Sequence, residues 1–175
     1  LLKRIVETRG RASNIGRASK QTKTKSAISS DNLDDVPFDV PDGWCWTTVG
    51  DITPSLQYGT SEKSSSKGKV AVLRMGNITR NGTIDYSDLV YTSNDKDIES
   101  LMLKKGDVLF NRTNSSEWVG KTAIYDGKIP AIYAGYIIRM TPYLVDPYYL
   151  TFVMISPYER DWCNMVKTDG VNQSN

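Results

Sequence analysis

Short apolar runs, separated by glycine, asparagine, aspartate and serine, fill most of the chain after residue 36. These runs are too short for stable helices and are rich in β-branched and aromatic residues, which predicts strands. The predicted strands cover residues 70–75, 108–110, 119–125 and 131–141, with a shorter one at Trp44 and Trp46 seated against the core. Asn81-Gly82 is the strongest hairpin signal, because both turn positions favour positive φ, and we expect residues 83–86 to fold back on the preceding strand.

Helical patterns are concentrated in the second half of the chain. Residues 93–102 form a weak helix candidate, and Asp146-Pro147 and Ser156-Pro157 each supply the cap and first residue of a helix. The aromatic stripe that follows Pro147 is interpreted as core rather than as a surface for stacking nucleobases. The sequence therefore predicts an α/β (α+β) fold, with a twisted, mostly antiparallel sheet of short strands and a few helices mainly in the C-terminal half.

Three segments of different composition divide the chain. Residues 1–12 have helical apolar spacing, and we interpret them as the end of a helix that starts outside this chain. Residues 13–35 are basic and polar, as is typical of a flexible linker, which is either simply solvated or touches DNA or RNA. Residues 36–175 form the folded domain. Because there is no initiator methionine, we interpret the chain as a fragment of a longer protein.

The segment 106–127 combines two apolar runs with a polar tip between them, which predicts a strand-loop-strand unit. Arg112 offers a planar fork of donors, and Asn114 offers an amide that can pair bidentately with a base edge. Hydroxyl groups suited to phosphate oxygens complete the tip, at Thr113, Ser115 and Ser116. The alternative is a solvated loop whose side chains bond their own backbone.

Gly120-Lys121-Thr122 resembles the end of a phosphate-binding P-loop. That motif needs a glycine at position 115 and a helix afterwards, whereas this chain has Ser115 and a strand-like AIYDG. We therefore reject the interpretation as a nucleoside triphosphate site.

Histidine is absent from the sequence of 175 residues. Its absence excludes Ser-His-Asp and Cys-His nucleophiles, histidine-ligated metals and histidine acid-base catalysis. The acidic residues are scattered singly and are interpreted as turn residues, and Cys45 and Cys163, which lack ligand spacing, as buried thiols. No apolar run approaches the roughly 20 residues that span a bilayer, and no signal peptide is visible, so we expect a cytoplasmic protein.

Charge is unevenly distributed along the chain. Residues 1–30 contain eight basic residues and one acidic residue, which leaves 14 basic and 19 acidic residues in 31–175. An acidic body argues against sequence-blind phosphate binding, so contact with DNA requires a local basic patch. Residues 61–80 supply such a patch, with five basic residues against a single glutamate.

Six ordered blocks of sequence carry a resemblance to a known family. They are FDVPDGWCW at 38–46, YGTS at 58–61, LRMGNI at 73–78, GDVLFNR at 106–112, VGKTA at 119–123 and PYYL at 147–150. Together they resemble the target recognition domain of the specificity subunit of a type I restriction-modification system. The resemblance covers about residues 36–175 and depends on the order of the blocks rather than on any one of them.

The resemblance implies a function without catalysis. Specificity subunits of this family carry two recognition domains, each reading one half of a bipartite double-stranded DNA target. Long helices separate the domains and dock the methyltransferase (modification) subunits, through which the restriction subunit joins; these partners methylate, translocate and cleave. The resemblance implies no cofactor, metal, membrane or small-molecule substrate. This chain departs from the pattern because the helical spacer expected after Asn175 is missing.

The residue chemistry and the resemblance point to the same candidate site. The predicted DNA-binding residues are Tyr58, Gly59, Thr60, Ser61, Lys63, Ser64, Lys67, Arg74, Asn77, Arg80, Arg112, Thr113, Asn114, Ser115 and Lys121. We expect residues 58–64, 74–80 and 112–115 to lie on one concave side. The candidates for base edges are Arg74, Arg112 and Asn114. Those for phosphates are Lys63, Lys67, Arg80 and Lys121, with Tyr58 against sugar or base.

Structural roles remain open for two of the arginines. Arg74 and Arg112 alternatively pair with Asp85 or Asp107. At the level of function, a methyltransferase or nuclease with its own chemistry is disfavoured, since the sequence has no glycine-rich cofactor loop after a strand, no Asn-Pro-Pro-aromatic tetrad and no clustered carboxylates. The other alternative is a non-catalytic protein-interaction module whose aromatic residues dock a partner.

Overall fold

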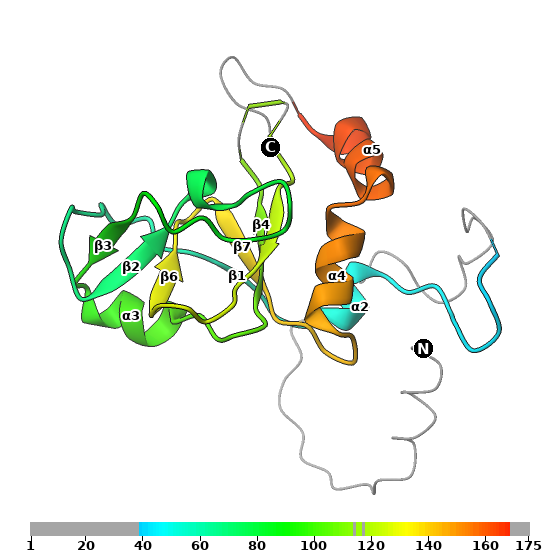
Figure 1. Cartoon of the computed structure of the whole chain (residues 1–175), viewed down its shortest axis with the longest axis horizontal. Coiled ribbons are helices and arrows are strands. Elements are labelled where there is room, and N and C mark those ends of the chain that lie inside the picture. The colour runs from blue at the N-terminus through cyan, green and yellow to red at the C-terminus, as the bar shows by residue number, and fades with distance from the viewer. Residues whose placement is uncertain (1–38, 114, 117, 169–175) are drawn as a thin grey trace, which may run out of the picture. The chain divides into compact units, whose positions relative to one another are not determined.

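The computed structural model describes residues 39–113, 115–116 and 118–168, and the chain divides into two compact units, Leu1–Ile52 and Thr53–Asn175 (Figure 1). The predicted helix end at 1–12 and linker at 13–35 lie outside the described residues. So does Asn114 of the predicted tip.

The described part of the first unit contains one short helix, α2 (Val49–Ile52). Thr48 and Asp51 stabilise its start, because the Thr48 hydroxyl donates to Asp51 Oδ2 at 2.8 Å and accepts from the Asp51 amide at 3.2 Å. The predicted strand at Trp44 and Trp46 is wrong: these residues form no strand, and Trp44 is exposed. Two alternating tryptophans are too short a pattern to make a strand, and Gly43 turns the chain just before them with a φ of 84°.

The second unit contains two sheets of short strands. The four-stranded sheet is antiparallel throughout, in the order β1 (Leu56–Tyr58), β7 (Ile137–Met140), β4 (Val108–Asn111) and β5 (Thr122–Ile124). The three-stranded sheet has the order β3 (Val90–Thr92), β2 (Val70–Leu73) and β6 (Ala131–Tyr133), with β2 and β6 parallel. The predicted α+β class with mostly antiparallel short strands is confirmed, but the strands form two sheets rather than one.

The predicted strand at 131–141 divides into β6 and β7, one in each sheet (Figure 1). A turn at residues 134–136 separates them, where the Gly135 amide donates to the Thr60 carbonyl at 2.7 Å. A side chain at Gly135 would bring a Cβ to 3.1 Å from that carbonyl oxygen, a tight contact that glycine avoids. This connection joins the two sheets covalently.

The main core lies where residues of both sheets meet. Leu73 of β2, Ile132 of β6, Leu109 of β4 and Ile137 of β7 are fully buried members of one cluster. The alternation of a strand places Val108 on the opposite face from Leu109. There α4 (Pro147–Met154) packs against β4 and β5, with its Leu150 and Met154 buried. The four-stranded sheet is therefore covered on both faces along β4 and β5.

The predicted helices are confirmed where local chemistry defines them. Asn94 caps α3 (Asp95–Leu101), within the predicted range 93–102. Asp146 Oδ1 accepts from the Tyr148 and Tyr149 amides at 2.8 and 3.0 Å at the start of α4. Ser156 caps α5 (Pro157–Val166) through the Glu159 amide.

The interpretation of the aromatic stripe as core is wrong. Large side chains of α4 and α5 are exposed, at Tyr148, Tyr149, Phe152, Tyr158 and Trp162. The buried side of the two helices is supplied instead by Leu150, Thr151, Met154 and Cys163. Cys163 is a buried thiol as predicted, whereas Cys45 is exposed. These buried side chains mark the packed side of the two helices, and the aromatic rings lie outside it.

The Asn81-Gly82 turn reverses the chain as predicted, with a different backbone conformation. Ile78 and Ile84 form a single antiparallel bridge, and the Thr79 amide donates to the Thr83 carbonyl at 3.0 Å. Gly82 has a φ of 79°, but Asn81 does not adopt positive φ. The turn follows the short 3-10 helix η2 (Met75–Asn77) rather than a long strand, so no extended hairpin forms.

No helix among the described residues is long and apolar enough to cross a membrane. The same residues contain no group of three or more cysteine and carboxylate side chains able to hold a metal ion.

Candidate functional site

The polar tip between β4 and β5 is a closed loop, as the strand-loop-strand prediction requires. The Asn111 amide donates to the Lys121 carbonyl at 2.8 Å, and the Gly120 amide donates to the Asn111 carbonyl at 2.9 Å. Inside the loop, the amides of Trp118 and Val119 both donate to the Ser115 carbonyl, at 2.8 and 3.0 Å. The tip is therefore held by its own backbone hydrogen bonds, while Arg112 and Ser115 are exposed.

Arg112 and Tyr58 lie together although they are far apart in sequence. The guanidinium carbon of Arg112 is 5.4 Å from the centroid of the Tyr58 ring, a cation–π distance. The Arg112 amide donates to the Tyr136 carbonyl at 3.2 Å, which fixes the base of the tip to the β6–β7 connection. Because Tyr58 is also exposed, the pair presents an aromatic face and a fork of donors to solvent.

Gly59 and Thr60 have structural contacts. A Cβ at Gly59 would lie 2.1 Å from the Tyr133 carbonyl oxygen, so no side chain fits there. The Thr60 amide donates to the same carbonyl at 2.9 Å, and its hydroxyl donates to Asp97. These residues dock the end of β1 onto β6.

The other residues of this predicted segment are exposed and lie elsewhere. Ser61, Lys63, Ser64 and Lys67 belong to the exposed loop between β1 and β2. Ser65, within that loop, forms an isolated antiparallel bridge with Tyr91 of β3. The two lysines are therefore near β3, at the opposite edge of the three-stranded sheet from β6.

Arg74 and Asn77 stabilise the turn around η2. Arg74 Nη2 lies 2.8 Å from Asp88 Oδ2. The arginine thus has an acidic partner, but this partner is Asp88 rather than the predicted Asp85 or Asp107. Asn77 is buried; its amide nitrogen donates to the carbonyls of Asp85 and Asp88 at 2.9 Å each. Its side-chain oxygen accepts from the Arg74 amide at 2.7 Å.

Lys121 is buried rather than presented to solvent. Its ammonium donates to the carbonyls of Met75 and Ile78 at 2.8 and 2.6 Å, and it lies 4.9 Å from the Trp118 ring centroid. Burial, with a smaller contribution from the positive charge of Arg80, lowers the pKa of Lys121. The side chain links the η2 turn to the base of the tip.

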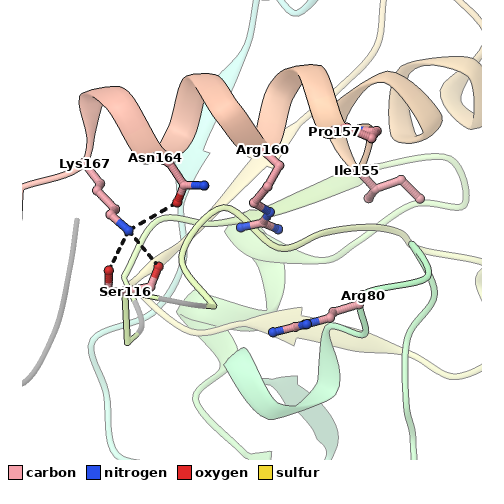
Figure 2. A pocket seen from close by; sticks show the side chains of 7 residues that line it. All are labelled: Arg80, Ser116, Ile155, Pro157, Arg160, Asn164 and Lys167. Carbon is pink, nitrogen blue, oxygen red and sulfur yellow. Dashed lines mark hydrogen bonds between the residues drawn. The ribbon is translucent and has the colours of Figure 1, made fainter.

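A groove that the sequence did not predict lies between the tip and α5 (Figure 2). It has a volume of about 710 Å³, and its lining consists of Arg80, Ser116, Ile155, Pro157, Arg160, Asn164 and Lys167; we call it the basic groove. Lys167 Nζ lies 2.5 Å from Ser116 Oγ and 3.2 Å from Asn164 Oδ1. Arg80 of this set is among the predicted DNA-binding residues, and Ser116 was predicted as a tip hydroxyl suited to phosphate, but the other five were not predicted.

A sequence signal for the missed residues exists. Arg160 and Asn164 are spaced i and i+4 on a helix whose cap was predicted correctly, and Lys167 is the residue at which that helix ends. Residues at that spacing share one helix face. The Ser156 signal thus contained enough information to place Arg160 and Asn164 on one side of α5.

Comparison with known proteins identifies sequences similar to this chain. No protein-family model matches it. Over 142 residues, 78% of the chain, it is 29% identical to a putative type I restriction enzyme MjaX specificity subunit from Methanocaldococcus jannaschii. It is 30% identical over 114 residues, 63% of the chain, to the type I restriction enzyme EcoAI specificity subunit from Escherichia coli.

The chain is a relative of type I restriction enzyme specificity subunits. It spans 33% of the length of the first of these relatives and 18% of the second. The resemblance drawn from six sequence blocks is therefore confirmed.

In this relative of specificity subunits, the predicted site residues separate into two groups. Those buried or in tight backbone contact are Gly59, Thr60, Asn77, Thr113 and Lys121. Those with exposed or partly exposed side chains are Tyr58, Ser61, Lys63, Ser64, Lys67, Arg74, Arg80, Arg112 and Ser115. The second group, together with the basic groove, is the surface available to a ligand.

Proposed function

We propose that this chain recognises double-stranded DNA in a sequence-specific manner, as a recognition domain of a type I restriction-modification specificity subunit. The observation that carries the proposal is the exposed Arg112–Tyr58 pair at the β4–β5 tip, in a chain related to specificity subunits. An arginine fork pairs bidentately with the O6 and N7 atoms of guanine, which is the commonest specific contact in the major groove.

Other exposed residues complete the reading surface. Ser115 follows Arg112 in the same tip and offers a hydroxyl to phosphate. Arg74 is held by Asp88, but an ion pair with exposed partners contributes only about 0–1 kcal/mol, so DNA can compete for the arginine. Asn114, which lies outside the described residues, remains our candidate for pairing with an adenine edge.

The larger assembly is part of the same proposal. This domain reads one half of a bipartite target, and modification and restriction subunits bound to the full-length subunit methylate and cleave the DNA. The chain itself is non-catalytic and needs no cofactor, and its ligand implies a cytoplasmic location. The relationship to specificity subunits does not favour a pure protein-interaction module.

Target selection from a random duplex pool tests the proposal. The experiment uses the full-length specificity subunit that contains this domain, in complex with its modification subunit. We expect a bipartite motif, and Arg112→Ala should relax one half of it by about 1–3 kcal/mol at one base pair, or roughly 5- to 150-fold.

The matched control is Lys104→Ala, which removes an exposed cation that precedes β4, at the opposite end of that strand from the tip. It should leave both halves of the motif unchanged. No enrichment by an intact wild-type complex would refute DNA reading and return the interaction module as the better hypothesis.

A further inference from the structure

The basic groove concentrates positive charge in an otherwise acidic part of the chain. Residues 31–175 contain 14 basic and 19 acidic residues, yet three cations and no acidic residue are among the residues described as lining this groove. We propose that the basic groove binds the phosphodiester backbone of one DNA strand, so that α5 holds the strand whose bases the tip reads. The choice of DNA as the polyanion rests on the proposed function; the anion site itself rests on the groove.

One face of α5 supplies half of the site. Arg160, Asn164 and Lys167 point from the helix towards the tip in Figure 2, and Arg80 lies across the groove from them. Charge-assisted hydrogen bonds from arginine and lysine to phosphate are among the strong ones, and asparagine adds neutral donors. The set therefore has the donor chemistry of a phosphate contact.

The cations are already positioned by the protein. Lys167 donates to the carbonyl and hydroxyl oxygens of Ser116, at 3.2 and 2.5 Å. Arg160 Nη1 donates to the Val119 carbonyl at 2.7 Å, which uses one of the five donors of its guanidinium. The Arg80 guanidinium stacks 3.7 Å from the Trp118 ring centroid. Side chains held in this way lose little conformational freedom when they bind an anion.

The openness of the groove favours a polymer over an enclosed small molecule. Small-molecule sites bury about 70–90% of their ligand and are lined mainly by apolar residues. Here two of the seven lining residues, Ile155 and Pro157, are apolar, and the groove is open to solvent. A DNA strand that passes along the surface needs neither an enclosed cavity nor a mainly apolar lining.

The groove and the reading tip share one loop. Ser116 lines the groove and Ser115 precedes it, while Arg112 begins the same loop beside Tyr58. A duplex whose bases face Arg112 therefore brings a backbone close to Ser116. This proximity gives phosphate contacts their usual role, which is to fix register while base contacts give specificity.

Salt-dependent DNA binding tests the inference in the full-length subunit with its modification partner. Binding of the selected target duplex and of a scrambled duplex is measured from 50 to 200 mM salt for Arg80→Gln, Lys167→Gln and the double variant. Each neutralised phosphate contact should lower the slope of log K against log salt by about 0.9. We expect each single variant to weaken both duplexes equally, roughly three- to tenfold at low salt.

Two further variants distinguish charge from folding. Lys167→Arg keeps the charge and should restore the slope, whereas Lys104→Gln removes a cation outside the groove and should leave it unchanged. Arg160 is left intact because it also supports the Val119 carbonyl. Thermal unfolding of every variant should give the wild-type midpoint.

The possible results separate this inference from the proposed function. If the wild type binds selectively and both groove variants keep its slope of log K against log salt, the proposal that the groove binds phosphates is wrong. The proposal that the domain reads DNA sequence is then unaffected. A changed target motif in Lys167→Gln also overturns the groove proposal, since a phosphate contact carries no base information. If the wild type binds both duplexes equally and the groove variants bind them more weakly, phosphate binding by the groove is supported. Sequence-specific recognition by the tip is then refuted.

Discussion

Lys121 shows how burial changes the role of a charged residue. Its ammonium is enclosed by the protein and donates to the carbonyls of Met75 and Ile78, so it joins the η2 turn to β5. Burial lowers its pKa, which means that the site disfavours the charge, and the two hydrogen bonds compensate. We infer a positioning role, which holds Arg80 and the tip in one arrangement.

Lys121→Met should therefore destabilise the fold without removing a phosphate contact. It leaves two carbonyls without their donor, and we expect the free energy of unfolding to fall by roughly 1–3 kcal/mol. Urea denaturation measures this loss.

Lys104→Met, at an exposed position, is the control and should change stability by less than about 0.5 kcal/mol. If Lys121→Met leaves stability intact but lowers the salt slope of DNA binding, the lysine contacts phosphate after all.

Sequence patterns identified some of these side chains and not others. Arg112 was recognisable because a polar tip between two strand-like runs is exposed whatever the rest of the fold does. The burial of Lys121 was not, because Gly-Lys-Thr is the same local sequence whether or not distant carbonyls approach it. Its two partners are 46 and 43 residues away in sequence.

At the scale of elements, local chemistry was the better guide. Asp146 and Ser156 cap α4 and α5 as predicted, because a capping side chain bonds amides only two or three residues away. The division of residues 131–141 into β6 and β7 was missed although Gly135 interrupts the run, because a lone glycine in a strand pattern fits a bulge equally well. The division depends on Gly135 meeting Thr60, a contact with a distant part of the chain.

The connection between β5 and β6 should make stability depend on pH. Asp126 Oδ1 accepts from the Tyr86 hydroxyl at 2.5 Å and from the Lys128 amide at 2.9 Å. Burial opposes ionisation, but these hydrogen bonds and the Lys128 charge outweigh it and hold the pKa of Asp126 below its usual value. A carboxylate with a lowered pKa stabilises the fold above its unfolded-state value near 4, and this stability is lost as the pH falls through the folded value.

Tyr86→Phe should weaken that dependence. Removal of the hydroxyl donor is expected to cost about 0.5–1 kcal/mol at pH 7, since solvent screens the mostly exposed carboxylate. The decline in stability below about pH 4 should become shallower, because the folded-state pKa of Asp126 returns towards its unfolded value. Chemical denaturation at a series of pH values measures both effects.

Tyr91→Phe, which removes a hydroxyl from a ring packed against the same core, should leave the acid slope unchanged. Equal acid slopes in wild type and Tyr86→Phe would mean that the Tyr86–Asp126 hydrogen bond does not set the pKa.

At the scale of the whole molecule, charge is divided between a basic N-terminal segment and an acidic remainder. Residues 1–30 carry eight basic residues and one acidic residue. Non-specific attraction to DNA grows with the number of phosphates that cations neutralise. The N-terminal segment should therefore add affinity for any duplex, while the tip determines which duplex is preferred.

Neutralisation of that segment tests this division of roles. The variant replaces Arg11, Arg17, Lys20, Lys23 and Lys25 with glutamine in the full-length subunit. We expect affinity for target and scrambled duplexes to fall by the same factor, roughly tenfold at low salt, with the selected motif unchanged. Titration of both duplexes at two salt concentrations measures this loss of affinity. Identical affinities with and without the cations would mean that residues 13–35 are a solvated linker that does not contact DNA.

The class of the fold was predictable from the sequence, but its division into two sheets was not. Short alternating runs and turn residues fix the class locally. Which strands become neighbours depends on pairings such as β1 with β7 and β2 with β6, which join segments far apart in sequence. The same long-range pairings determine that Tyr58 meets Arg112.

The pairing of β1 with β7 also sets the order of events during synthesis. Gln57 and Arg139 contact each other across the two strands although they are 82 residues apart in sequence. At about 5–20 residues per second, the ribosome finishes β7 roughly 4–16 s after β1. Until then the backbone amides and carbonyls of β1 have no strand to pair with, and this unpaired strand edge is open to chaperones and to other nascent chains. The first strand in the described part of the chain therefore pairs only after β7 has been made.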